Sequence, residues 1–119
     1  MGNLSQSLDE LMQIDGATAA AVVDSNSGMV LGKAGGGLDL DVAAAGNTEV
    51  VRAKIKTMKS LGLKDGIEDI LITLGKQYHI IRPMTERAGV FVYVVLDKAK
   101  ASLALARIKT AEVESGLSL

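Results

Sequence analysis

The only histidine of the chain, His79, is the side chain whose ordinary pKa suits acid–base chemistry near neutral pH. It stands between Tyr78 and Ile80 in a segment that reads as a strand, and the sequence has no cysteine. A general base or a metal centre would need partner groups that the sequence does not place beside it. We therefore expect a structural or surface role for His79, with no metal and no cofactor.

Carboxylate pairs are the next candidates for acid–base work, and the sequence offers two: Asp24 with Asp69, and Asp9 with Glu10. Asp24 opens a turn-like segment, Asp24 to Gly28, and the other acids stand in polar surroundings. We interpret them as turn and surface charges. Because no nucleophile, base or metal set accompanies them, the sequence predicts a protein that is not an enzyme.

The glycine-rich segment 32–37 superficially suggests a phosphate-binding loop, since it carries Lys33 and leads into a helix. A Walker loop needs Ser or Thr directly after its lysine, whereas Ala34 follows Lys33 here. Asp39 and Asp41 also stand where the anion would bind. We expect this segment to be a flexible connection instead.

A basic ridge is predicted on the longest helix, where Arg52, Lys56 and Lys59 recur at helical spacing. Such a ridge is typical of a solvated helix face, and it is also suited to an acidic partner surface. The chain has 13 Lys and Arg against 14 Asp and Glu, so it lacks the overall positive field of a general nucleic-acid binder. The partner-binding interpretation of this ridge stays a hypothesis.

Length and composition indicate one domain, residues 1–119, of 12.4 kDa. A chain of this size can bury a core without disulfides. No segment reaches the roughly 18 uninterrupted apolar residues typical of a membrane span, and we expect no direct membrane insertion. Without a recognisable leader or cysteines, the cytoplasm is the expected compartment.

The hydrophobic pattern predicts eight elements in the order helix, two strands, helix, three strands, helix. Two of the strands are apolar throughout, which places them at the centre of a mostly antiparallel sheet covered on both faces. The final helix is expected to begin after Asp97 as its cap. The expected elements are a helix over 4–14, strands over 17–23 and 29–33, a helix over 40–61, strands over 67–74, 77–82 and 90–96, and a helix over 98–114.

Self-association is predicted from two features. The stripe of the long helix that should face the sheet comprises Leu40, Ala44, Val51, Ile55 and Met58, and one flank beside it is more apolar than a solvated face needs. The strand that follows the helix is apolar on both sides, and as a sheet edge it would invite pairing with its own copy. The predicted dimer interface comprises Ala43, Asn47, Val50, Lys54, Leu61, Ile70, Leu71 and Ile72.

The whole chain resembles the roadblock family of dynein-associated light chains and small-GTPase regulators. The resemblance is carried by Leu8 to Leu11 leading into Ile14 to Asp24, by Ser27 to Leu31, and by Leu71 to Arg82. It implies an α+β, roadblock/profilin-like fold, with a five-stranded antiparallel sheet, one long helix on one face and two terminal helices on the other. It also implies a dimer in which third strands pair and long helices lie side by side.

Members of that family are platforms for Ras-like GTPases or for motor and sensory complexes, and they generally carry no catalytic residues. The resemblance therefore implies a non-catalytic homodimeric adaptor that binds a Ras-like small GTPase, with Arg52, Lys56 and Lys59 as the predicted partner-binding residues. The alternative is a small-molecule-binding sensory module of similar fold, which would show a deep apolar pocket with convergent polar groups.

Overall fold

The computed structural model describes residues 2–119, and their elements follow the predicted order. Most boundaries lie within a few residues of the expected ones, and the start of the last helix differs more, as considered below. The elements are α1 (Leu4–Met12), β1 (Ala17–Asp24), β2 (Met29–Gly35), α2 (Leu40–Ser60), β3 (Ile70–Thr73), β4 (Gln77–Pro83), β5 (Val90–Asp97) and α3 (Leu103–Gly116).

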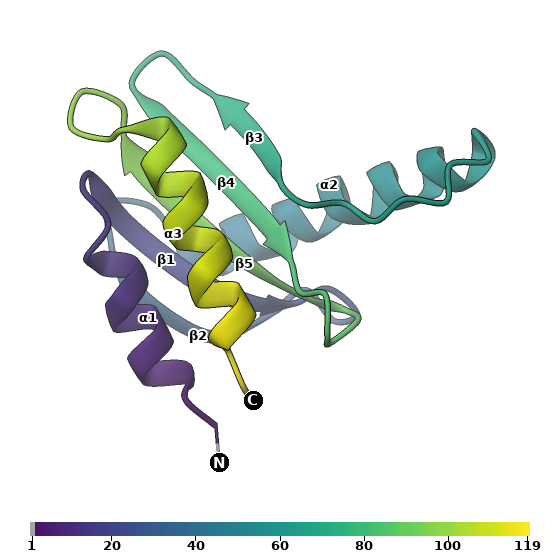
Figure 1. Cartoon of the computed structure of the whole chain (residues 1–119), viewed down its shortest axis with the longest axis horizontal. Coiled ribbons are helices and arrows are strands. Elements are labelled where there is room, and N and C mark those ends of the chain that lie inside the picture. The colour runs from purple at the N-terminus through teal and green to yellow at the C-terminus, as the bar shows by residue number, and fades with distance from the viewer. Residues whose placement is uncertain (1) are drawn as a thin grey trace.

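The five strands form one antiparallel sheet with the order β2-β1-β5-β4-β3 (Figure 1). β1 and β5 lie at the centre, where Val22 pairs with Val92, and nearly all of their residues are buried. Continuous apolar sequence is what a strand covered on both faces requires. The predicted central position of these two strands is confirmed, and β2 and β3 form the edges.

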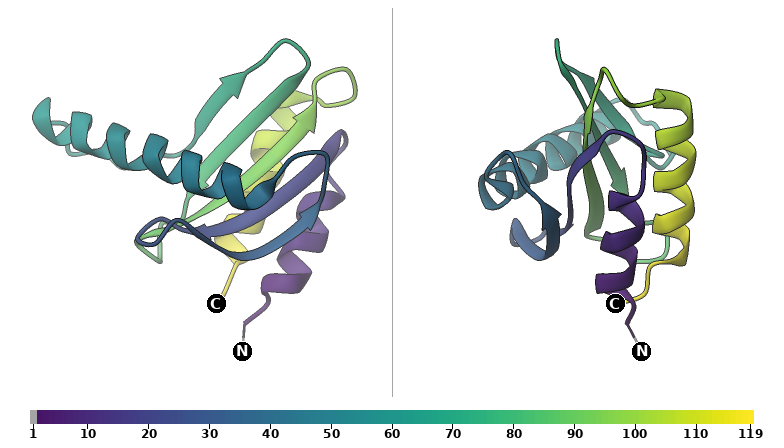
Figure 2. Two further views of the ribbon diagram at one scale, coloured as in Figure 1. Left: turned by 180° about the vertical axis from the view of Figure 1, so that it is seen from behind. Right: turned by 90° about the vertical axis from the view of Figure 1, so that its left-hand side faces the viewer.

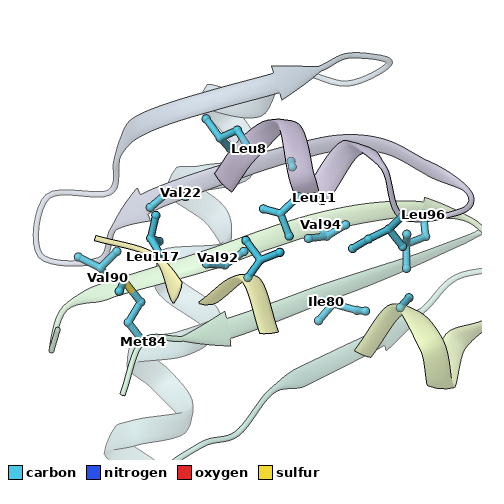
Figure 3. Packing of buried hydrophobic residues seen from close by; sticks show 14 residues of the cluster. Leu8, Leu11, Val22, Ile80, Met84, Val90, Val92, Val94, Leu96 and Leu117 are labelled. Carbon is cyan, nitrogen blue, oxygen red and sulfur yellow. The ribbon is translucent and has the colours of Figure 1, made fainter. Parts of the chain in front are cut away.

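The helices cover the sheet on both faces, with α1 and α3 on one side and α2 on the other (Figure 2). Successive residues of β5 supply the two cores, since side chains alternate along a strand. Val92 and Val94 join Leu11 under α1 and α3 (Figure 3), whereas Phe91 and Tyr93 face α2. Each large apolar side chain buried in this way contributes roughly 1.5–3 kcal/mol. The predicted arrangement of the layers is confirmed.

Gly32 allows α1 to pack against β2 at close range. A Cβ atom at this position would lie 2.9 Å from Cδ1 of Leu8 and 3.0 Å from Cδ2 of Leu4. Both leucines lie on the buried side of α1, so a larger residue would push the helix away from the strand. Part of the glycine-rich segment thus has a packing role.

α2 begins over the sheet and ends beyond it (Figure 1). A 21-residue helix is about 32 Å long, and its buried residues all lie between Leu40 and Val51. Beyond Val51 the helix passes the β3 edge. The prediction that Ile55 faces the sheet was wrong, because its side chain is 41% exposed, and Met58 is only partly buried and belongs to neither core.

The start of the last helix also differs from the expected one. Asp97 does not cap a helix at Lys98, because its side chain accepts a hydrogen bond from the backbone N–H of Ala99 at 3.0 Å in a turn. α3 instead begins after Ser102. The intervening residue Ala101 packs against Gly16, where a Cβ atom would lie 2.9 Å away. This turn fixes the end of β5 against the start of β1.

Candidate functional site

The basic ridge is exposed along the second half of α2. Arg52, Lys56 and Lys59 line an open hollow of about 400 Å³, together with Ile55 and two loops from the sheet. No ion pair involves these three cations within residues 2–119. Their charges are therefore available to an acidic group from outside.

The floor of the hollow is formed where the β1–β2 and β4–β5 loops meet. The backbone N–H of Ser25 donates to the carbonyl of Gly89 at 2.7 Å, and a Cβ atom on Gly89 would lie 2.6 Å from Nδ2 of Asn26. Asp24 holds the first loop, accepting from the N–H of Asn26 at 3.0 Å and from the hydroxyl of Ser27 at 2.9 Å. Asp24 is the turn residue that its sequence context predicts.

The helix residues assigned to the dimer interface divide into two groups. Ala43 and Asn47 are partly buried against the chain's own sheet, whereas Val50, Lys54 and Leu61 are exposed. Leu61 is 65% exposed and Val50 is 37% exposed. The outer part of this predicted flank is thus free for contact, and its inner part already has intramolecular neighbours.

The strand residues of the same prediction lie on the β3 edge. Ile70 and Ile72 are partly buried and pack against the core beneath α2, whereas Leu71 points to the other side and is 36% exposed. Within residues 2–119, β3 pairs only with β4. Its outer backbone edge is therefore open and carries no charged side chain.

His79 takes part in a polar network between α2 and the sheet. Its Nδ1 lies 2.9 Å from the hydroxyl of Tyr93, and its Nε2 lies 2.9 Å from Oε1 of Gln77. Burial lowers the pKa of His79. Burial also raises the pKa of Tyr93, and a hydrogen bond from Asn47 opposes that rise. These contacts explain His79 structurally, and sequence reasoning missed the roles of Tyr93 and Asn47.

The start of α2 is already occupied by the chain's own carboxylates. Oδ1 of Asp39 accepts from the backbone N–H groups of Asp41 and Val42, at 3.1 and 3.2 Å, and Lys33 is paired with Asp41 at 3.2 Å. A phosphate would have to displace these groups. Across residues 2–119, no three His, Cys, Asp or Glu side chains gather closely enough to hold a metal ion.

Two ion pairs attach β4 and the segment before β3 to α3, and neither was anticipated from the sequence. Arg107 makes a bidentate pair with Asp69, at 2.8 and 2.9 Å, which holds the segment before β3. Arg82 of β4 donates to Glu114 at 2.8 Å. Thr85, in the loop between β4 and β5, donates to the same carboxylate at 3.3 Å. The paired residues are 32 and 38 positions apart in the sequence, so no local spacing pattern predicts either pair.

None of the helices within residues 2–119 has the length and apolar character needed to cross a bilayer.

No protein-family profile and no curated protein sequence matches the chain. Solved structures do match it. Myxococcus xanthus MglB is 21% identical, with a TM-score of 0.82, over 94% of this chain and 89% of that one. A Roadblock/LC7 domain from Streptomyces avermitilis is 17% identical, with a TM-score of 0.81, over 96% of this chain and 93% of that one. An MglB with a tetrameric arrangement is 18% identical, with a TM-score of 0.82, over 96% and 84%. The chain therefore has the roadblock/LC7 fold, as its sequence predicts.

Proposed function

From the roadblock/LC7 fold of this chain, we propose that it is a non-catalytic homodimeric adaptor that binds a Ras-like small GTPase or a related signalling or motility complex in the cytoplasm. Among the described residues, no group of His, Cys, Asp or Glu side chains is placed to hold a metal ion. The described residues do offer an open sheet edge and a basic helix face, which are features of a docking protein.

The observation that carries the proposal is that α2 overhangs the open β3 edge (Figure 1). If β3 paired antiparallel with its copy, a two-fold axis would pass beside this edge. Each overhanging helix end would then lie over the partner's half of a continuous sheet. Exposed apolar residues there, Val50, Ile55 and Leu61, would be covered, and Leu71 would lie at the join. The tetrameric arrangement of a similar MglB supports self-association.

The basic ridge would be doubled by the same symmetry and would form the GTPase-binding surface. Such a platform acts by affinity alone: it shifts the switch equilibrium of the GTPase by the difference in its affinity for the GTP and GDP states. Exposed cations at such a surface influence the association rate and its salt dependence more than the affinity. Arg52 is the one arginine on α2. Because the proposed action is by binding alone, Arg52 does not have to act as a catalytic finger.

Sedimentation velocity of the purified chain tests the dimer. We expect a mass of twice 12.4 kDa at micromolar concentration. A monomer of 12.4 kDa at the highest attainable concentration would refute the homodimer.

Partner binding is tested with the Ras-like GTPases of the source organism, each loaded with GDP or with a non-hydrolysable GTP analogue. Lys56→Glu should slow association by about tenfold at low salt, while Lys100→Glu, an exposed cation on a turn after β5, should leave it unchanged. Equal binding by both variants, with folding and dimerisation intact, would remove the ridge from the proposal.

The alternative of a small-molecule module finds less support. The cores on both faces of the sheet are filled by apolar side chains, and the hollows lie at the surface, between helices and loops. A sensor for a small ligand would need an enclosed pocket with convergent polar groups.

A further inference from the structure

A second hollow lies between α1 and α3. These two helices cover the face of the sheet opposite α2 (Figure 2). The hollow has a volume of about 460 Å³, and its floor is formed by the buried side chains of Ile14 and Val113. Leu105 forms part of its wall and is 45% exposed. Ile108, three residues further along the same helix face, is 56% exposed. The surface around the hollow is therefore more apolar than a helix facing only water requires.

The chain termini hold α1 and α3 together beyond one end of this groove. The side chain of Asn3 donates to the carbonyl of Gly116 at 2.8 Å and accepts from the N–H of Ser118 at 2.8 Å. The backbone N–H of Asn3 donates to the carbonyl of Ser118 at 3.0 Å. The groove is thus bounded by two helices whose spacing is fixed by the fold.

The rim of the groove is acidic. Glu10, Asp15 and Glu112 line it against a single cation, Lys109, which is 3.7 Å from Glu112. Glu10 and Asp15 have no ion pair within residues 2–119. The chain has no Lys or Arg before Lys33, so α1 brings no positive charge to this face.

We propose that this groove docks an amphipathic, basic helix of another protein. A helix laid along a groove presents apolar side chains one turn apart, which matches Leu105 in the wall of the groove and the exposed Ile108 further along α3. Lysine or arginine residues on its flanks would meet Glu10 and Asp15, and this charge complementarity would orient the helix. The acidic rim disfavours an anionic membrane surface as the occupant. The basic helix of a second copy, α2, belongs to the opposite face, where the dimer contact is proposed.

The test uses the full-length chain and a fluorescein-labelled helical peptide built from leucine and lysine in an amphipathic order. The same residues in a scrambled, non-amphipathic order form one control peptide, and a leucine–glutamate helix forms the other. In fluorescence anisotropy, the parent chain should bind the amphipathic basic peptide with micromolar affinity and should not bind the controls. NMR shifts of backbone amides should change at residues 10–15 and 105–113.

Groove variants separate this site from nonspecific attraction. Leu105→Ser and Asp15→Lys should each weaken binding about tenfold, whereas Glu86→Lys, the same charge change on an exposed loop outside the groove, should have no such effect. Circular dichroism and sedimentation would verify that each variant is folded. Equal loss in all three, or none, would overturn the proposal. Assemblies larger than a dimer that disappear in Asp15→Lys would also overturn it, because the occupant would then be a second copy.

Discussion

Replacing Arg82 with methionine should destabilise the domain more than any other single charge removal. Glu114 is only 3% exposed and accepts from Nε of Arg82 at 2.8 Å, while the Arg82 side chain is 21% exposed. Removing one partner of a fully buried ion pair costs about 3–5 kcal/mol, because a buried charge stays behind. Since Arg82 is partly exposed and Thr85 still donates to Glu114, we expect about 3 kcal/mol.

The free energy of unfolding is measured by urea denaturation at one fixed protein concentration, since dimerisation would add to apparent stability. For a domain of this size, 3 kcal/mol corresponds to a fall in Tm of about 12 °C. Arg87→Met is the matched control: Arg87 is exposed in the loop that follows β4 and has no ion pair within residues 2–119.

A double variant, Arg82→Met with Glu114→Leu, separates the cost of the unpaired charge from that of lost packing. We expect it to recover more than half of the lost stability, because no buried charge remains. The reasoning is refuted if Arg82→Met costs less than about 1 kcal/mol, or if the double variant is less stable than the single one.

Four further predictions concern the sheet. Because burial lowers the pKa of His79, the unfolded chain binds its proton more readily, so stability should be lost as the pH falls below about 6.5, and His79→Gln should flatten that loss in urea titrations. Burial raises the pKa of Tyr93, so the unfolded chain releases the Tyr93 proton more readily than the folded one. Stability should therefore be lost as the pH rises above about 10. Gly35→Ala should cost about 2 kcal/mol or more in the same assay, because Gly35 has φ +77° and a Cβ would collide with the backbone. In sedimentation equilibrium, Leu71→Lys on the β3 edge should weaken the proposed dimer at least about tenfold, whereas Leu31→Lys on the β2 edge should not; similar dimers in both would contradict the edge assignment.

The sequence predicted most of the fold because its elements have local signals. Two uninterrupted apolar runs identify β1 and β5 as central strands, and helical periodicity with Asp39 at its start identifies α2. Periodicity does not reveal how far a helix extends past its sheet, so Ile55 was assigned to the core. That extent depends on how α2 crosses strands that are distant in the sequence, which is tertiary information.

Candidate sites were less accessible from the sequence than the fold. The ridge of Arg52, Lys56 and Lys59 follows from spacing within one helix, and the structure leaves it exposed. The groove between α1 and α3 joins residues about 100 apart, Glu10 with Glu112. No pattern within either helix indicates that they share a rim. Surfaces built from one element are predictable in this way, and surfaces built from two distant elements are not.

The two proposed docking surfaces should act independently, because the whole thickness of the sheet separates them. The ridge is on α2 and the groove is between α1 and α3. These helices lie on opposite faces of the sheet (Figure 2). Substitutions far apart with no shared contacts have additive effects within about 0.5 kcal/mol. A double variant, Lys56→Glu with Asp15→Lys, should therefore show each single defect unchanged, in GTPase association and in peptide anisotropy respectively. Coupling beyond that limit would mean that the sheet transmits a change between its faces or that both ligands compete for one surface.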